Sequence, residues 1–326
     1  MSKNSIKEFV NKRNKVKKIF TAGPASLLEE NIKGLRPCFG RGDFDYDRVE
    51  KFVLNKLKKM SKHKNIARMQ GSGSLALEIV VTNFVHGKVL IVDTGYYSDR
   101  LYMLAKDSKK SFKRISLIKK IKWTEIDKFK DKFDWIWACP TETSMGLKIP
   151  IKKLKKLSIR CKSKLALDAT GSFALEENHN LADVISYSSC KGLFGLTGAS
   201  FVSFNNMPKN KVNSFYLNIF NHIEKKMTGP YHAICSLYEV LKIHSKIKKS
   251  VIINKKKFVS TMKEWISYKN ENQPLLCTYV DKKIDSSNKD IILYKPRITL
   301  SGSVVCHLGE AHLKDNAKGK ILNNLK

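Results

Sequence analysis

Five short, continuously apolar runs are the feature that most constrains how this chain folds. They lie at residues 88–92, 134–138, 164–168, 183–187 and 199–204, and segments with helical patterns separate several of them. A strand that is apolar along its whole length is buried on both faces, as in a sheet with helices on either side. The sequence therefore predicts an α/β fold with a doubly wound, mostly parallel central sheet.

The remaining elements follow from apolar periodicity, caps and breakers. We expect helices at 43–69 (with Asp43 as N-cap), from residue 75, around 102–105, and at 151–157, 230–249 and 255–268, and short strands near 276–280 and 291–294. This pattern divides the chain into an N-terminal arm or helix (1–20), a large domain (21–235) and a small α+β C-terminal domain (236–326).

Polar side chains follow four of the apolar runs. Asp93, Thr141-Glu142-Thr143, Asp168 and Ser188-Ser189 each come at or just after a strand end. Ligands of open α/β sheets bind beyond the carboxyl ends of the strands. We therefore expect these residues to surround one site.

The charge balance raises nucleic acid as a partner. The 326 residues include 62 Lys and Arg against 29 Asp and Glu, a formal net charge of +33. Phosphate neutralisation rewards such an excess. However, only nine of the basic residues are arginine, and no aromatic-basic RNA signature is present. Solvated lysine-rich helix faces explain the charge better, so we expect no nucleic acid as the main partner.

Cysteine usage and hydropathy indicate the compartment. The seven cysteines are dispersed without a CxxC pair and are expected to be reduced thiols. No run reaches the roughly 18 apolar residues of a membrane span. His307, Glu310 and His312 do not have zinc-motif spacing, so no metal is expected. Together these features predict a cytoplasmic protein.

Three motifs carry candidate chemistry. Gly71-Ser72-Gly73-Ser74 opens a helix and is either a phosphate cradle or a simple capping turn. Lys191, between a strand end and a glycine-rich loop, is either a Schiff-base lysine or one more surface lysine. Asp168 ends an apolar strand, where a carboxylate needs a partner such as a protonated pyridine nitrogen, a metal or a helix N-terminus.

The order of these motifs resembles the class V aminotransferases of the fold-type I pyridoxal-phosphate (PLP) enzymes. Within that class the chain is most similar to 2-aminoethylphosphonate–pyruvate and alanine–glyoxylate (serine–pyruvate) transaminases. The resemblance extends from Thr21-Ala22-Gly23-Pro24 to about residue 240. It implies a large domain with a seven-stranded sheet, bound PLP, an amino donor, a keto-acid acceptor, and a homodimer with shared active sites.

The resemblance also implies residue roles. Lys191 would be the Schiff-base lysine and proton shuttle, and Asp168 would keep the pyridine nitrogen protonated. The other cofactor contacts would be Ser72, Gly73, Ser74 and Ser189 at the phosphate, Tyr97 and Thr170 on the two ring faces, Thr143 at the phenolic oxygen, and Thr228 and Tyr231 reaching the neighbouring subunit's phosphate.

Substrate binding departs from the family pattern. Ala22 and Gly23 match substrate-contacting positions, but Val304 stands where relatives carry an arginine for the substrate carboxylate. Arg297 is the nearby candidate for that role, or else a surface arginine in a turn. Cys190 replaces a larger polar residue before the lysine, and Pro140 replaces a histidine.

The sequence thus favours a ping-pong aminotransferase that transfers nitrogen from 2-aminoethylphosphonate or a small amino acid to a keto acid such as pyruvate. Two alternatives stay open. One is a PLP-dependent lyase or desulfurase on the same fold. The other is a non-catalytic nucleic-acid-binding relative, against which the joint presence of Lys191 and Asp168 argues.

Overall fold

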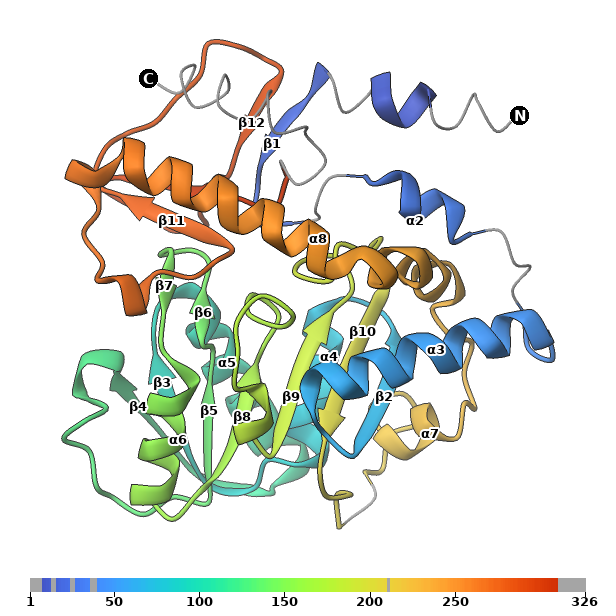
Figure 1. Cartoon of the computed structure of the whole chain (residues 1–326). Coiled ribbons are helices and arrows are strands. Elements are labelled where there is room, and N and C mark those ends of the chain that lie inside the picture. Colours follow the sequence, from blue (N-terminus) through green and yellow to red (C-terminus); the bar gives the residue numbers. More distant parts are fainter. Residues whose placement is uncertain (1–7, 13–15, 24–26, 36–39, 210–211, 310–326) are drawn as a thin grey trace.

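A seven-stranded sheet forms the centre of the computed structural model, which describes residues 8–12, 16–23, 27–35, 40–209 and 212–309 (Figure 1). The strand order is β2-β10-β9-β8-β5-β3-β4, and only β10 runs antiparallel to its neighbours. The strands are β2 (Asn65–Gln70), β3 (Gly87–Asp93), β4 (Ile115–Lys122), β5 (Trp135–Ala138), β8 (Lys164–Asp168), β9 (Val184–Ser188) and β10 (Ala199–Phe204). The predicted mostly parallel sheet is confirmed.

Helices cover both faces of this sheet, because strand side chains that point to either face are apolar and must be buried. In β3, Val89 and Ile91 join one buried cluster with residues of α4 and α5, whereas Leu90 and Val92 join another with residues of α3, α6 and α8. Successive strand side chains point to opposite faces, so both faces are sealed. The helices are α2 (Glu29–Lys33), α3 (Phe44–Ser61), α4 (Gly73–Asn83), α5 (Tyr96–Phe112), α6 (Ile151–Arg160), α7 (Ile219–Ile223) and α8 (Tyr231–Thr261).

The expected helix over 43–69 was too long. Asp43 does cap α3, accepting from the backbone N–H groups of Asp45 and Tyr46, but the helix ends at Ser61. Lys62 then takes a left-handed conformation with φ 55°, and β2 begins at Asn65. Pairing with β10 makes this segment a strand, and that partner lies far away in the sequence.

One helix, α8, covers the first helix expected over 230–249 and part of the second expected over 255–268, and it ends at Thr261 instead of residue 268. α8 runs for 31 residues without interruption. Val251, between the two predicted helices, and Phe258 are both buried, so the apolar face continues across the expected break. The domain boundary predicted at residue 235 falls inside α8 and stays a prediction.

Two small sheets complete the C-terminal part. β11 (Cys277–Val280) pairs antiparallel with β13 (Ser303–Cys306), and β1 (Lys18–Phe20) pairs in parallel with β12 (Ile291–Leu293). Phe20 is fully buried in a cluster with Phe258 of α8. The end of the predicted N-terminal arm is therefore part of the C-terminal layer, while residues 1–7 and 13–15 of that arm lie outside the described chain.

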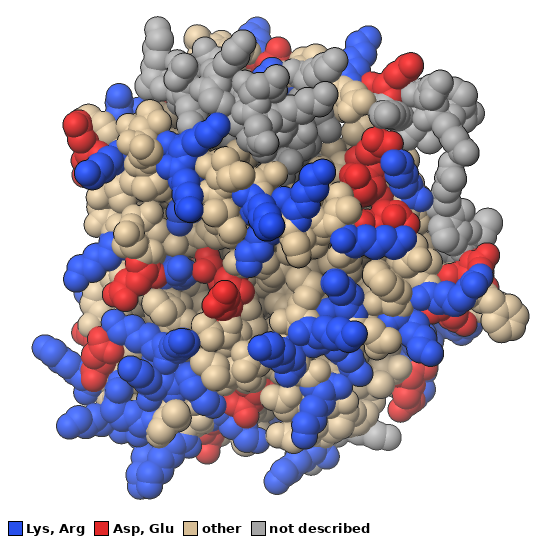
Figure 2. Space-filling model, viewed as in Figure 1, with Lys and Arg blue, Asp and Glu red and all other residues tan. Residues whose placement is uncertain are grey.

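The lysines are spread over the surface. Figure 2 shows Lys and Arg scattered across the face viewed, among acidic and uncharged residues, rather than gathered in one stripe. No helix in the described part of the chain is long and apolar enough to cross a membrane.

Candidate active site

A small cavity of about 190 Å³ lies at the carboxyl edge of the sheet. It brings together segments that follow β2, β3, β5, β8 and β9. Of the residues predicted from sequence, it is lined by Ser72, Gly73, Ser74, Tyr97, Thr143, Asp168, Thr170, Lys191 and Arg297. Its other lining residues are Leu77, Arg100, Cys139, Thr141, Gly171, Ser188 and Cys190.

The N-terminus of α4 forms one wall. Ser72 is its N-cap residue, yet the Ser72 side chain makes no capping hydrogen bond. A Cβ on Gly73 would lie 3.1 Å from the Thr170 hydroxyl oxygen and 3.7 Å from Cβ of Ser188, so glycine keeps this approach open. First-turn N–H groups and the positive end of the helix dipole make such a terminus an anion cradle.

Asp168 and Lys191 face this cradle from two strand ends. Asp168 ends β8 with 4% of its surface exposed, and its Oδ1 accepts the backbone N–H of Thr170 at 3.0 Å. Lys191 follows β9, and its Nζ lies 5.4 Å from the centre of the Tyr97 ring. A Cβ on Gly23 would lie 2.9 Å from Cγ of Lys191, so Gly23 packs against the lysine side chain.

A buried glutamate holds the segment that carries Tyr97. The Glu142 carboxylate accepts the backbone N–H of Tyr97 at 2.9 Å and that of Ser144 at 3.1 Å. Burial raises the pKa of Glu142, and the hydrogen bonds from Ser144 and Tyr97 oppose that rise. Because α5 begins at Tyr96, this carboxylate also lies at a helix N-terminus, where the dipole favours negative charge.

Two arginines line the cavity, Arg297, which was predicted from sequence, and Arg100, which was not. Arg297 donates to the Tyr96 hydroxyl at 3.2 Å, and Arg100 donates to the Ser74 hydroxyl at 3.3 Å. The Arg100 guanidinium also lies 5.1 Å from the Tyr97 ring centre. Hydrogen bonds from Arg297 and then Arg100 lower the pKa of Tyr96. The cavity thus has two adjacent guanidinium groups at its wall.

Five predicted residues do not line this cavity: Ala22, Gly23, Ser189, Thr228 and Tyr231. Of these, Gly23 still packs against the Lys191 side chain, as described above. Ser189 is buried and donates to the backbone carbonyls of Leu196 and Ala199, while Ser188 lines the cavity in its place. Ala22 is buried in an apolar cluster.

Thr228 is exposed, and Tyr231 lines a separate cavity of about 430 Å³. That cavity also holds Arg68, which is paired with the buried Glu50. The expectation that Thr228 and Tyr231 serve a neighbouring subunit stays a prediction.

His307, considered above as a metal ligand, is buried and hydrogen-bonded to the Thr278 hydroxyl at 2.9 Å. Glu310 and His312 lie outside the described residues. Cys139 and Cys190 are the two cysteines at the cavity. Burial, with the nearby Asp168 and Glu142 carboxylates, raises the pKa of Cys139 well above its usual value.

Sequence comparison supports the resemblance described above. The chain is 23% identical over 248 residues to a 2-aminoethylphosphonate–pyruvate transaminase of Pseudomonas aeruginosa, covering 68% of this chain and 67% of that protein. No family model matches the chain.

Solved structures agree on the fold. The aspartate aminotransferase of Thermus thermophilus superposes with a TM-score of 0.79 at 15% identity, over 94% of this chain and 97% of that one. The alanine–glyoxylate aminotransferase of Nostoc sp. gives 0.79 at 16% identity, over 95% and 94%.

The architecture is therefore that of the PLP fold-type I enzymes, and the chain resembles their class V aminotransferases. Within that class, the sequence matches are to 2-aminoethylphosphonate–pyruvate transaminases. These matches support a PLP-dependent transaminase as the enzyme class.

Proposed function

We propose that this chain is a PLP-dependent aminotransferase. It moves an amino group from a small amine, 2-aminoethylphosphonate or a small amino acid, to a 2-oxo acid such as pyruvate, in two half-reactions. One observation carries the proposal: Lys191, Asp168 and the uncapped N-terminus of α4 line the same small cavity.

The residues present suit the cofactor. The α4 terminus with Ser72, Gly73 and Ser74 would hold its phosphate, and the buried Asp168 would pair with its pyridine nitrogen. Tyr97 and Thr170 would contact the ring, and Thr143 its phenolic oxygen. When bound, PLP supplies an electron sink for the bonds at the substrate carbon.

The chain's own residues would then position and move protons. Asp168 would keep a positive charge on the pyridine nitrogen, because a carboxylate with 4% exposure is poorly solvated and favours a cationic partner. Lys191 would accept and return a proton at its Nζ beside the substrate carbon. Glu142 acts as a positioning residue, since it holds the backbone of Tyr97.

The two arginines would bind the anionic group of the substrates. Arg297 and Arg100 line the cavity from different segments, so together they present several N–H donors to a carboxylate or phosphonate. This arrangement would replace the arginine that the family pattern leads one to expect where this chain has Val304.

Assembly and location are part of the same proposal. A homodimer is supported by the resemblance at Thr228 and Tyr231, which lie outside the cavity of their own chain. A cytoplasmic location is supported by the six cysteines within the described residues, all of which are free thiols.

The raised pKa of Cys139 argues against its use as a desulfurase nucleophile, because a thiol attacks far more slowly than a thiolate.

The test is a half-reaction. The PLP-loaded protein is mixed with 2-aminoethylphosphonate, alanine or serine in the absence of a keto acid, and its absorption is followed. We expect one donor to remove the band near ~400–430 nm, the region of the lysine-bound cofactor, and pyruvate to restore it. If the donors leave the band unchanged while the protein releases pyruvate or sulfide from an amino acid, the lyase or desulfurase alternative is supported instead.

A further inference from the structure

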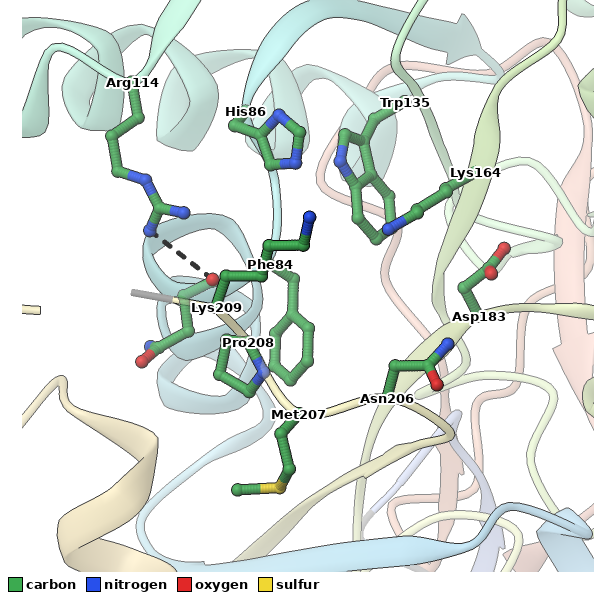
Figure 3. A pocket seen from close by; sticks show the side chains of 11 residues that line it. Phe84, His86, Arg114, Trp135, Lys164, Asp183, Asn206, Met207, Pro208 and Lys209 are labelled. Carbon is green, nitrogen blue, oxygen red and sulfur yellow. Dashed lines mark hydrogen bonds between the residues drawn. The ribbon is translucent and has the colours of Figure 1, made fainter. Parts of the chain in front are cut away.

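A second and larger cavity, of about 700 Å³, lies at the opposite edge of the same sheet (Figure 3). The parallel strands begin here: Trp135 is the first residue of β5, Lys164 is the first of β8, and His86 directly precedes β3. A volume of ~300–1,000 Å³ is typical of sites for small molecules. None of its lining residues belongs to the cavity that holds Lys191.

Three cations from separate segments line this amino-edge cavity. They are Arg114 before β4, Lys164 on β8 and Lys209 after β10. Arg114 is fixed, because its Nη1 donates to the backbone carbonyl of Thr82 at 2.8 Å. Among the described lining residues, Asp183 carries the one carboxylate, and it already accepts the backbone N–H of Leu165 at 2.9 Å.

All three cations lower the pKa of His86. Burial lowers its pKa first, and the charges of Arg114, Lys164 and Lys209 lower it further, opposed by Asp134. Figure 3 shows Lys209 reaching toward His86. The three positive charges therefore act on the same space, where a group with two negative charges would satisfy them.

One part of the cavity wall is aromatic and apolar. Phe84, Trp135 and Met207 line it, and Lys164 Nζ lies 5.5 Å from the Trp135 ring centre. Trp135 is 3% exposed, and its indole Nε1 has no hydrogen-bond partner among the described residues.

We propose that the amino-edge cavity binds a small phosphate monoester that carries a flat, apolar ring. The phosphate is held by Arg114, Lys164 and Lys209, and the ring packs on Phe84 and Trp135. This site is separate from the proposed reaction, because its residues lie at the other end of the strands.

Phenyl phosphate is the probe, with inorganic phosphate and phenol as its two halves. Binding to the full chain is measured by isothermal titration calorimetry after the protein has been loaded with PLP and the unbound PLP has been removed, because free PLP is itself a phosphate monoester with a flat ring. We expect saturable binding of phenyl phosphate, with weaker binding of inorganic phosphate and none of phenol. Equal affinity for phenyl phosphate and inorganic phosphate would overturn the ring assignment.

Lys209→Gln assigns the binding to this cavity, and Lys256→Gln is the control. Both remove one charge from an exposed lysine, but Lys256 lies on α8 and does not line the cavity. We expect about tenfold weaker binding in Lys209→Gln, equivalent to ~1.4 kcal/mol, and no change in Lys256→Gln. No saturable binding, or an equal loss in the two variants, would contradict the proposal. The comparison holds whether or not the protein takes up PLP.

Discussion

The two edges of the central sheet carry cavities that differ in size and in the burial of their carboxylate, although three cations and one carboxylate among the described residues line each of them. At the carboxyl edge the cavity is about 190 Å³ and combines Lys191 and Arg297 with the buried Asp168. At the amino edge it is about 700 Å³ and is lined by three cations and a single carboxylate that is already hydrogen-bonded. The same strands therefore begin at one cavity and end at the other.

This difference separates a site suited to chemistry from one suited to binding. At the carboxyl edge the buried Asp168, Lys191 and the N-terminus of α4 together can stabilise a charged group and also move a proton. At the amino edge the three cations can attract an anion, but Asp183, the one carboxylate among the described lining residues, is only partly buried. The predictions below test that division, starting with the largest expected effect.

Lys191→Ala should reduce transamination between 2-aminoethylphosphonate and pyruvate by at least ~10³-fold, because it removes the proposed proton shuttle. The measurement is steady-state pyruvate consumption. Lys256→Ala removes an exposed lysine from α8 and should retain the rate. Similar rates in the two variants would remove Lys191 from the catalytic site.

Asp168→Asn should lower kcat about a hundredfold or more, because a neutral amide cannot hold the pyridine nitrogen charged. The asparagine can still accept the Thr170 N–H through its side-chain oxygen, so the fold should persist. The thermal midpoint, measured beside the kinetics, separates these effects. A large fall in the midpoint with kcat intact would make Asp168 a structural residue only.

Arg297→Gln should raise KM for the anionic substrate about tenfold and leave kcat close to its original value, as expected for a group that binds ground and transition states alike. Arg48→Gln is the matched control, because Arg48 is an exposed arginine on α3. An unchanged KM in Arg297→Gln, with a raised KM in Arg100→Gln, would assign the substrate anion to Arg100.

The smallest effect concerns the amino edge. Burial is the main cause of the lowered pKa of His86, and Lys209 is the smallest contributor named, so Lys209→Gln should raise that pKa slightly. Bound phenyl phosphate should raise it in the original protein. The readout is the pH titration of the His86 ring signals by NMR. His244 serves as an internal reference, since its pKa is lowered by burial and by Lys248 and Lys56 instead. A His86 titration identical in both proteins would show that Lys209 does not face this cavity.

The sequence predicted those strands whose burial is visible in their own residues. β3, β5, β8, β9 and β10 have short, mostly apolar and buried cores, and all five form. β2 was mistaken for the end of a helix because its partner β10 lies more than a hundred residues away. β4 was missed because it is a lysine-containing edge strand with half-exposed and exposed positions.

The two cavities also differ in how far their residues could be predicted from the sequence. Asp168 and Lys191 could be chosen from sequence because each follows an apolar strand, and Gly73 because it opens a helix. Arg100 has no such local signal, and it reaches Ser74 only because α5 packs beside α4. The amino-edge cavity has no motif, since its cations come from positions 114, 164 and 209.

The central claim is that Lys191 binds PLP covalently within the carboxyl-edge cavity. Its most direct test is the absorption spectrum of the purified protein with added PLP, compared with that of Lys191→Ala. The account predicts a borohydride-sensitive band near ~400–430 nm in the original protein and its absence from the variant. The same band in both proteins, or in neither, would contradict it.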